Sequence, residues 1–151
     1  MTENTITAAI DQDLRKALKE RDRLRIDTLR MIKSALKNKQ IETGDELERE
    51  KEIEVISSYA RKCKESISEF RRGEREDLLS RAERELEIVM GYLPEQLSEE
   101  EIRDEVRRAI EDTGASSPRD LGRIMGTVMG KFKGKVDGSE VKQIALDLLE
   151  E

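Results

Sequence analysis

Acidic side chains are the residues of this sequence that come closest to offering chemistry, because 35 of its 151 residues are Asp or Glu. Three pairs stand four residues apart, a spacing at which two carboxylates on a helix can share a divalent ion: Glu48 with Glu52, Glu50 with Glu54, and Glu83 with Glu87. Lys and Arg are interleaved with all three pairs, a pattern that favours a solvated helical face instead. We therefore expect no metal site and no catalytic carboxylate.

The sequence gives equally little support for a nucleophilic catalytic site. The sequence contains no histidine, which is the commonest general base and metal ligand. Its single cysteine, Cys63, falls on the apolar side of a predicted helix, where a buried, inert thiol is the usual outcome. Glycine-rich motifs that cradle nucleotide phosphates are also missing from the sequence. We therefore predict no catalytic residue and no bound cofactor.

The sequence contains three glycines at a spacing of four, which is unusual within a predicted helix: Gly122, Gly126 and Gly130. They lie inside a predicted helix, where each glycine costs roughly 1 kcal/mol relative to alanine. On a helical wheel they occupy an arc of about 80°, and Arg119 and Arg123 fall on or beside that arc. Either another helix packs closely against this face, or an RNA backbone or a partner protein approaches it and the arginines bind phosphate. The pattern supports the two interpretations about equally.

Lysines extend this basic character beyond the helix. Lys131, Lys133 and Lys135 alternate with Phe132 and Gly134, which predicts a mobile cationic patch. Lysine near a helix C-terminus also stabilises the helix dipole, but this alternative covers Lys131 and at most Lys133, and Lys135 lies too far out. The glycines, the two arginines and these lysines form the first candidate site for RNA or for a partner protein.

A second basic stripe, formed by Arg23, Arg30, Lys33 and Lys37, lies on one face of an earlier predicted helix. A solvated face is the default interpretation. The stripe has almost no acid mixed in, however, which keeps RNA contact open for it. Residues 15–39 contain ten Lys or Arg and three acids, a local net charge of +7, although the whole chain carries −6. That overall charge argues against a wholly electrostatic nucleic-acid binder, and we expect no DNA partner.

Helices must position all these residues, because apolar side chains recur at spacings of three and four from Ile6 to Leu149. The second helix is expected to bury a wide stripe: Leu24, Thr28, Met31, Ile32, Ala35 and Leu36. We expect Gly44 to end that helix and Asp45 to cap the next one, which Gly73 ends. Two long helices joined at Gly73 suggest an antiparallel hairpin.

The clearest domain boundary is the segment LPEQLS at residues 93–98. Pro94 disfavours helical backbone at Leu93, and Ser98 with Glu101 matches a capping box for the helix that follows. We therefore predict an all-α fold, in which an N-terminal helical hairpin or bundle (residues 1–93) precedes a small three-helix C-terminal domain (residues 94–151). A turn between two helices of one domain would give a similar pattern.

The sequence also predicts the compartment. It has no run of 18 apolar residues, so no membrane partner is expected. Residues 1–13 lack the basic and apolar regions of a secretory signal, and a single cysteine rules out an intrachain disulfide framework. We therefore expect a cytoplasmic protein.

Five segments, in order along the chain, resemble the signature of the GatB/YqeY family. They are LRMIKSAL at residues 29–36, GEREDL at 73–78, LPEQLS at 93–98, GRIMG at 122–126 and KGKVDGSEV at 133–141. Each is short, but their order and spacing cover nearly the whole chain. The resemblance implies an all-helical fold similar to the tail of the B subunit of the tRNA-dependent amidotransferase. In that enzyme the tail helps to hold tRNA.

The resemblance also implies a function. We expect a tRNA-binding or translation-associated accessory that is not catalytic alone; the alternative is a helical adaptor that binds a protein such as an amidotransferase or a synthetase. Carbon–nitrogen ligase activity with glutamine as amido donor, which the family label implies, is the least favoured. The amidotransferase's reaction site lies in a larger separate domain, and nothing of that size exists in this chain.

Overall fold

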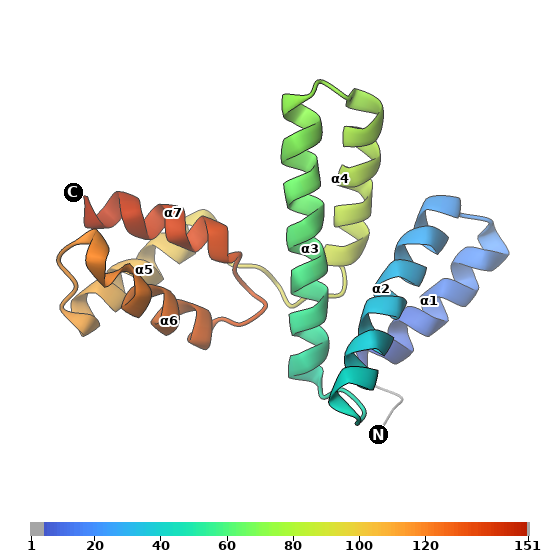
Figure 1. Ribbon diagram of the computed structural model, residues 1–151, viewed down its shortest axis with the longest axis horizontal. Coiled ribbons are helices and arrows are strands. Elements are labelled where there is room, and N and C mark those ends of the chain that lie inside the picture. Colours follow the sequence, from blue (N-terminus) through green and yellow to red (C-terminus); the bar gives the residue numbers. More distant parts are fainter. Residues whose placement is uncertain (1–4, 151) are drawn as a thin grey trace. The chain divides into compact units, whose positions relative to one another are not determined.

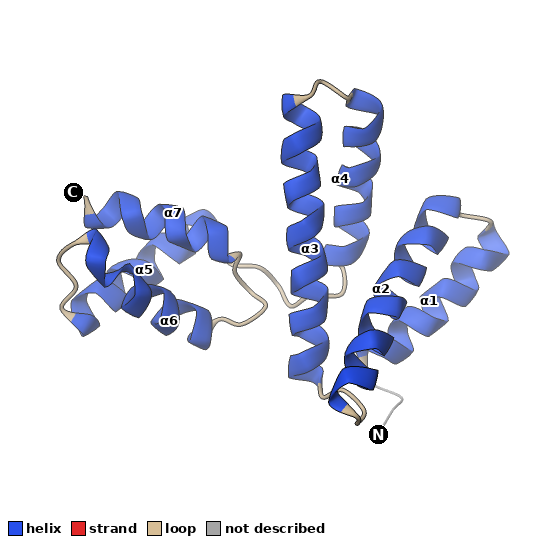
Figure 2. Ribbon diagram, in the orientation of Figure 1, coloured by secondary structure: helices blue, strands red, loops and turns tan. Residues whose placement is uncertain are grey.

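Helices make up all the regular structure of the computed structural model, which describes residues 5–150 (Figure 2). Within those residues the secondary structure consists of seven α-helices and one short 3-10 helix. The predicted all-α class is therefore confirmed. None of the helices in this range combines the length and the apolar character needed to cross a membrane.

The chain divides between Leu93 and Pro94 into two compact units, Met1–Leu93 and Pro94–Glu151. Each unit has its own cluster of buried apolar side chains. The first unit contains four helices: α1 (Ile6–Glu20), α2 (Arg23–Thr43), α3 (Arg49–Arg72) and α4 (Glu76–Met90). The second contains α5 (Glu99–Thr113), the 3-10 helix η2 (Pro118–Asp120), α6 (Leu121–Lys131) and α7 (Gly138–Leu149).

Two helical hairpins, α1 with α2 and α3 with α4, build the first unit (Figure 1). The turn between α1 and α2 needs only two residues, because Arg21 takes a left-handed conformation (φ 58°) and Asp22 caps α2 by accepting a hydrogen bond from the Arg25 amide. The hairpins share one aliphatic core, in which Ile10 of α1 and Ile56 of α3 are completely buried. This core fixes the direction in which the charged faces of α1 and α2 point.

The buried face of α2 differs from the predicted stripe. Met31 is 57% exposed, whereas Ile26 and Leu29, which the prediction left out, are buried together with Ile32 and Leu36. The prediction was right for Thr28, Ile32 and Leu36 and wrong for Met31. The error arose because α2 has two neighbouring rows of apolar residues, and periodicity alone does not say which row meets the other helices. The buried row is the one that packs against the shared core of the unit.

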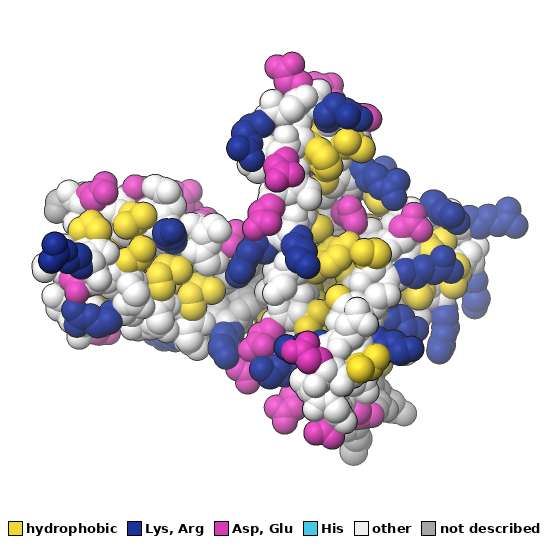
Figure 3. Space-filling view, in the orientation of Figure 1, with side chains coloured by type: hydrophobic (Ala, Val, Ile, Leu, Met, Phe, Trp, Pro, Cys, Tyr) yellow, Lys and Arg dark blue, Asp and Glu magenta, His cyan; other side chains and the backbone are white. Residues whose placement is uncertain are grey.

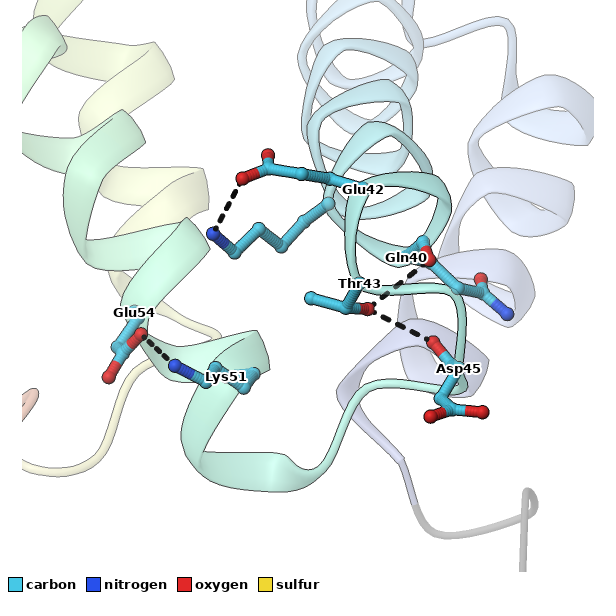
Figure 4. Close-up of polar contacts among 7 residues, drawn as sticks. Gln40, Glu42, Thr43, Asp45, Lys51 and Glu54 are labelled. Carbon is cyan, nitrogen blue, oxygen red and sulfur yellow. Dashed lines mark hydrogen bonds and ion pairs between the residues drawn. The ribbon is translucent and has the colours of Figure 1, made fainter.

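The turn between α2 and α3 also departs from the prediction (Figure 4). Gly44 ends α2 in a left-handed conformation (φ 81°), as expected. Asp45 does not cap α3, because the N-cap is Glu48, three residues later, without a side-chain hydrogen bond. The Thr43 hydroxyl instead donates to the carbonyl oxygens of Gln40 and Asp45, at 3.2 and 3.3 Å. The first bond satisfies a carbonyl in the last turn of α2, the second a carbonyl of the loop, and neither caps the start of α3.

The second unit packs its three α-helices around a core that includes Val106 of α5, Ile124 of α6 and Val141 of α7. The predicted capping box is confirmed: the Ser98 hydroxyl accepts from the Glu101 amide, and the Glu101 carboxylate accepts from the Ser98 amide. Burial of Ile124 and Val128 turns the opposite face of α6 towards solvent. That face carries the three glycines.

Candidate functional site

The glycine face of α6 is open. Gly122, Gly126 and Gly130 are all exposed, and a Cβ atom built on any of them would meet no atom within 4 Å, beyond the helix's own nearby backbone. No other helix of the second unit therefore packs against this face, so close packing within that unit does not explain the glycines. The helix backbone itself forms an accessible floor along α6, between its exposed side chains.

Charged side chains surround this floor. The Arg123 guanidinium is bonded to the Asp120 carboxylate one turn earlier. A backbone hydrogen bond from Ser116, followed by the hydrogen bond from the Arg123 side chain, holds the pKa of Asp120 below its usual value. The carboxylate therefore stays ionised and offsets part of the charge of Arg123. Arg119 is exposed and makes no ion pair with any described residue.

The lysines at the end of α6 and directly after it differ in their contacts. The Lys131 ammonium lies 3.4 Å from the Glu105 carboxylate of α5 and 5.3 Å from the centre of the Phe132 ring. Lys133 and Lys135 are exposed, and Lys135 makes no ion pair within the described residues. All eight residues of the first candidate site thus lie on or near α6, with Arg119 and Lys135 as its unpaired cations.

Gln96 holds the lysine loop, residues 131–135, in place. Its side-chain amide donates to the Gly134 carbonyl at 2.6 Å and to the Pro94 carbonyl at 2.8 Å. The Leu97 amide donates to the Lys135 carbonyl at 2.9 Å. The bonds to Gly134 and Lys135 tie the backbone of the loop to the segment before α5, and the bond to Pro94 braces that segment. Sequence reasoning missed Gln96, since its partner lies 38 residues away.

The second basic stripe lies on α2 and therefore belongs to the first unit, whereas the α6 residues belong to the second. The Lys33 ammonium pairs with Asp11 of α1 at 2.8 Å, and Arg23 pairs with Asp27 at 4.0 Å. Arg30 and Lys37 are exposed and make no ion pair within residues 5–150. Acids thus neutralise half of the stripe. In Figure 3 many dark blue side chains gather over α1 and α2.

Glu52 departs most from its predicted role on a solvated face, because it is only 1% exposed. Its carboxylate accepts from the Thr7 hydroxyl at 2.6 Å, from the Thr7 amide at 2.8 Å and from the Ile6 amide at 3.4 Å. The carboxylate of α3 thus satisfies the first amides of α1. Its oxygens are committed to these donors, so Glu48 and Glu52 do not form a shared ion site.

Cys63 is buried, as the sequence predicts. Burial, followed by the charge of Glu85, raises the pKa of its thiol from 9.0 to about 11. A thiol with so high a pKa stays protonated near neutral pH and is a poor nucleophile. The structure therefore places Cys63 in the core and not in a reactive site.

Comparison with known proteins gives the family of the chain. The family model described as "Yqey-like protein" matches residues 7–149. Curated relatives share the name "Altered inheritance of mitochondria protein 41, mitochondrial". The protein from Kluyveromyces lactis is 36% identical over 115 residues, and that from Lachancea thermotolerans is 35% identical over 114 residues. The match covers 74% of this chain in both cases, and 62% and 61% of the two relatives.

The chain thus spans less than two thirds of the length of these relatives. Their name refers to the inheritance of mitochondria and specifies no ligand or reaction. The family model covers nearly the whole chain, as the resemblance from the five motifs anticipated. The chain belongs to the YqeY-like family.

Proposed function

We propose that this protein binds RNA, with tRNA as the preferred class, and acts as an accessory of translation rather than as an enzyme alone. The observation that carries the proposal is the exposed backbone floor of α6 beside unpaired cations. A phosphate group can approach a glycine backbone more closely than a surface covered by side chains. Arg119 and Arg123 can then form paired hydrogen bonds to phosphate oxygens, and Lys133 and Lys135 add positive charge.

The mode of binding follows from composition. Aromatic residues make up only 3% of the chain, so stacking on bases supplies little of the affinity. Residues 98–151 carry nine Lys or Arg and thirteen acids, a net charge of −4. A few phosphate contacts on such a surface give weak, salt-sensitive binding that depends on RNA shape more than on sequence. We therefore propose that a protein partner, such as an amidotransferase or a synthetase, adds to the affinity.

The same proposal bears on location. The sequence favours the cytoplasm, whereas the fungal relatives are named as mitochondrial proteins. An accessory of translation has tRNA available in either compartment. The chemistry proposed for α6 is the same in both.

The test is a titration of labelled total tRNA with the full chain at low and at physiological salt. We expect binding with a steep salt dependence. The triple variant Arg123→Glu, Lys133→Glu and Lys135→Glu should bind more weakly, and its salt slope should be smaller by about one unit for each phosphate that is no longer bound. These three side chains are exposed, so the fold should tolerate the changes.

A second triple variant serves as a control, because it has the same net charge as the first. Arg103→Glu, Arg107→Glu and Lys142→Glu change the charge of the same unit by the same amount but leave α6 and its loop intact. Equally weakened binding in both triple variants would show that only net charge matters and that the α6 site is wrong. No binding by the wild-type chain at either salt would reject RNA binding and favour the helical adaptor, in which the α6 floor receives a partner's helix.

A further inference from the structure

A groove in the first unit brings together basic side chains from two helices. It has a volume of about 880 Å³ and lies between α1, the second half of α2 and the beginning of α3. Arg15 and Gln12 of α1 and Lys33, Lys37 and Gln40 of α2 line it. We call this site the α1–α2 groove. Lys33 and Lys37 belong to the second basic stripe, whereas Arg15 and Gln12 belong neither to that stripe nor to the first candidate site.

The cations of this groove differ in how far they are neutralised. Lys33 is paired with Asp11, which also lines the groove. Arg15 and Lys37 are exposed and make no ion pair with any described residue. Exposed cations of this kind keep their full charge for a ligand. Gln12 and Gln40 add neutral side-chain amides that can donate hydrogen bonds.

The acids of the groove are mostly engaged. Glu52 is saturated by the first amides of α1 and by the Thr7 hydroxyl, and Asp11 is held by Lys33. Glu46, from the loop before α3, is exposed and makes no ion pair with the described residues. Three cations and three acids line the groove in all, but Lys33 is paired with Asp11 and Glu52 is buried against the start of α1. The exposed and unpaired charges are therefore Arg15 and Lys37 against Glu46. Residues 15–39, which supply the three cations, carry a local net charge of +7.

We infer that the α1–α2 groove is a second binding site for RNA phosphate groups, used by the same RNA that contacts α6. This inference rests on the proposed function, because it takes RNA as the ligand. Arg15 and Lys37 make the phosphate contacts, and the two glutamine amides bind phosphate or sugar oxygens. Two weak sites on one ligand give an overall affinity that neither site reaches alone, since the second contact forms at a high effective concentration.

The test uses the full chain, labelled total tRNA and two opposite changes in the groove. Arg15→Glu with Lys37→Glu should weaken binding and lower the salt slope by about two units, one for each phosphate contact. Glu46→Lys should have the opposite effect, tighter binding and a steeper slope. A gain of binding cannot come from a loss of folding. Circular dichroism should show unchanged helix content in both variants, because all three side chains are exposed.

The control pair is Arg61→Glu with Arg72→Glu, which makes the same charge change on α3, in the same unit, away from the residues that line the groove. If the groove pair and the control pair weaken binding equally, or if Glu46→Lys does not strengthen it, the α1–α2 groove is not an RNA site. The proposed function would still hold in that case, provided that tRNA binding depends on Arg123, Lys133 and Lys135. Absence of wild-type binding rejects both.

Discussion

At the scale of single residues, a buried carboxylate has a structural role of which the sequence shows no sign. Glu52 sits among Lys, Arg and other Glu residues, in a pattern typical of a solvated face. The structure instead turns it inward, where it caps the start of α1 from a different helix. Its partners lie 45 and 46 residues away, so no local pattern could identify it. Gln96 escaped prediction for the same reason.

Removing this carboxylate should destabilise the first unit. We expect Glu52→Ala to lower the free energy of unfolding by about 1–3 kcal/mol, because two backbone amides and a hydroxyl lose their acceptor in a buried place. The control is Glu48→Ala, at an N-cap position whose side chain makes no capping bond. That change should stay within about 0.5 kcal/mol. Urea denaturation of both variants measures the difference, and equal effects would contradict the role given to Glu52.

At the scale of elements, helix ends could be predicted from sequence better than buried faces. Gly44 and the Ser98–Glu101 capping box end and begin helices as expected, because their chemistry is local. Met31 was assigned to the core and is exposed, since burial depends on which helix packs on which row. For the glycine face of α6 the sequence left close helix packing and ligand approach equally open, and the structure leaves this face uncovered within its unit. The apolar residues of α6 form a single row opposite the glycines.

The glycines of α6 give a prediction that separates stability from binding. Gly122→Ala and Gly126→Ala should each raise the free energy of unfolding by about 1 kcal/mol, because both lie in a helix and an added methyl group meets nothing within 4 Å. Both should weaken tRNA binding, because the methyl group raises the floor of the site. Thermal unfolding and the tRNA titration measure the two effects. Unchanged RNA affinity would mean that no ligand approaches the α6 backbone closely.

Gly114 supplies the contrasting control in the same unit. It ends α5 in a left-handed conformation (φ 70°), which alanine adopts only under strain. Gly114→Ala should therefore lower the free energy of unfolding by about 1 kcal/mol or more, although the space around it is as open as that around Gly126. Opposite signs at Gly114 and Gly126 would show that backbone conformation, and not available space, decides the outcome.

At the scale of the whole molecule, the two units have separate cores, and this predicts separate responses to core mutations. Ile56→Ala in the first unit and Ile124→Ala in the second each remove a completely buried side chain, at a cost of about 2–5 kcal/mol. We expect each change to reduce amide hydrogen-exchange protection in its own unit and to leave the other unit unchanged. Reduced protection throughout the chain after either change would show instead that the two units unfold together.

The hydrogen bonds that fix the lysine loop also decide which of its atoms a ligand meets. Carbonyl oxygens repel anions, and a glycine-containing loop commonly exposes several of them. Here the carbonyls of Gly134 and Lys135 are turned onto Gln96 and Leu97. The negative ends of two backbone dipoles are thereby withdrawn from solvent, so the backbone offsets less of the positive charge of the lysines. An uncharged residue, Gln96, thus affects the electrostatic potential that a ligand meets at this loop as well as the path of its backbone.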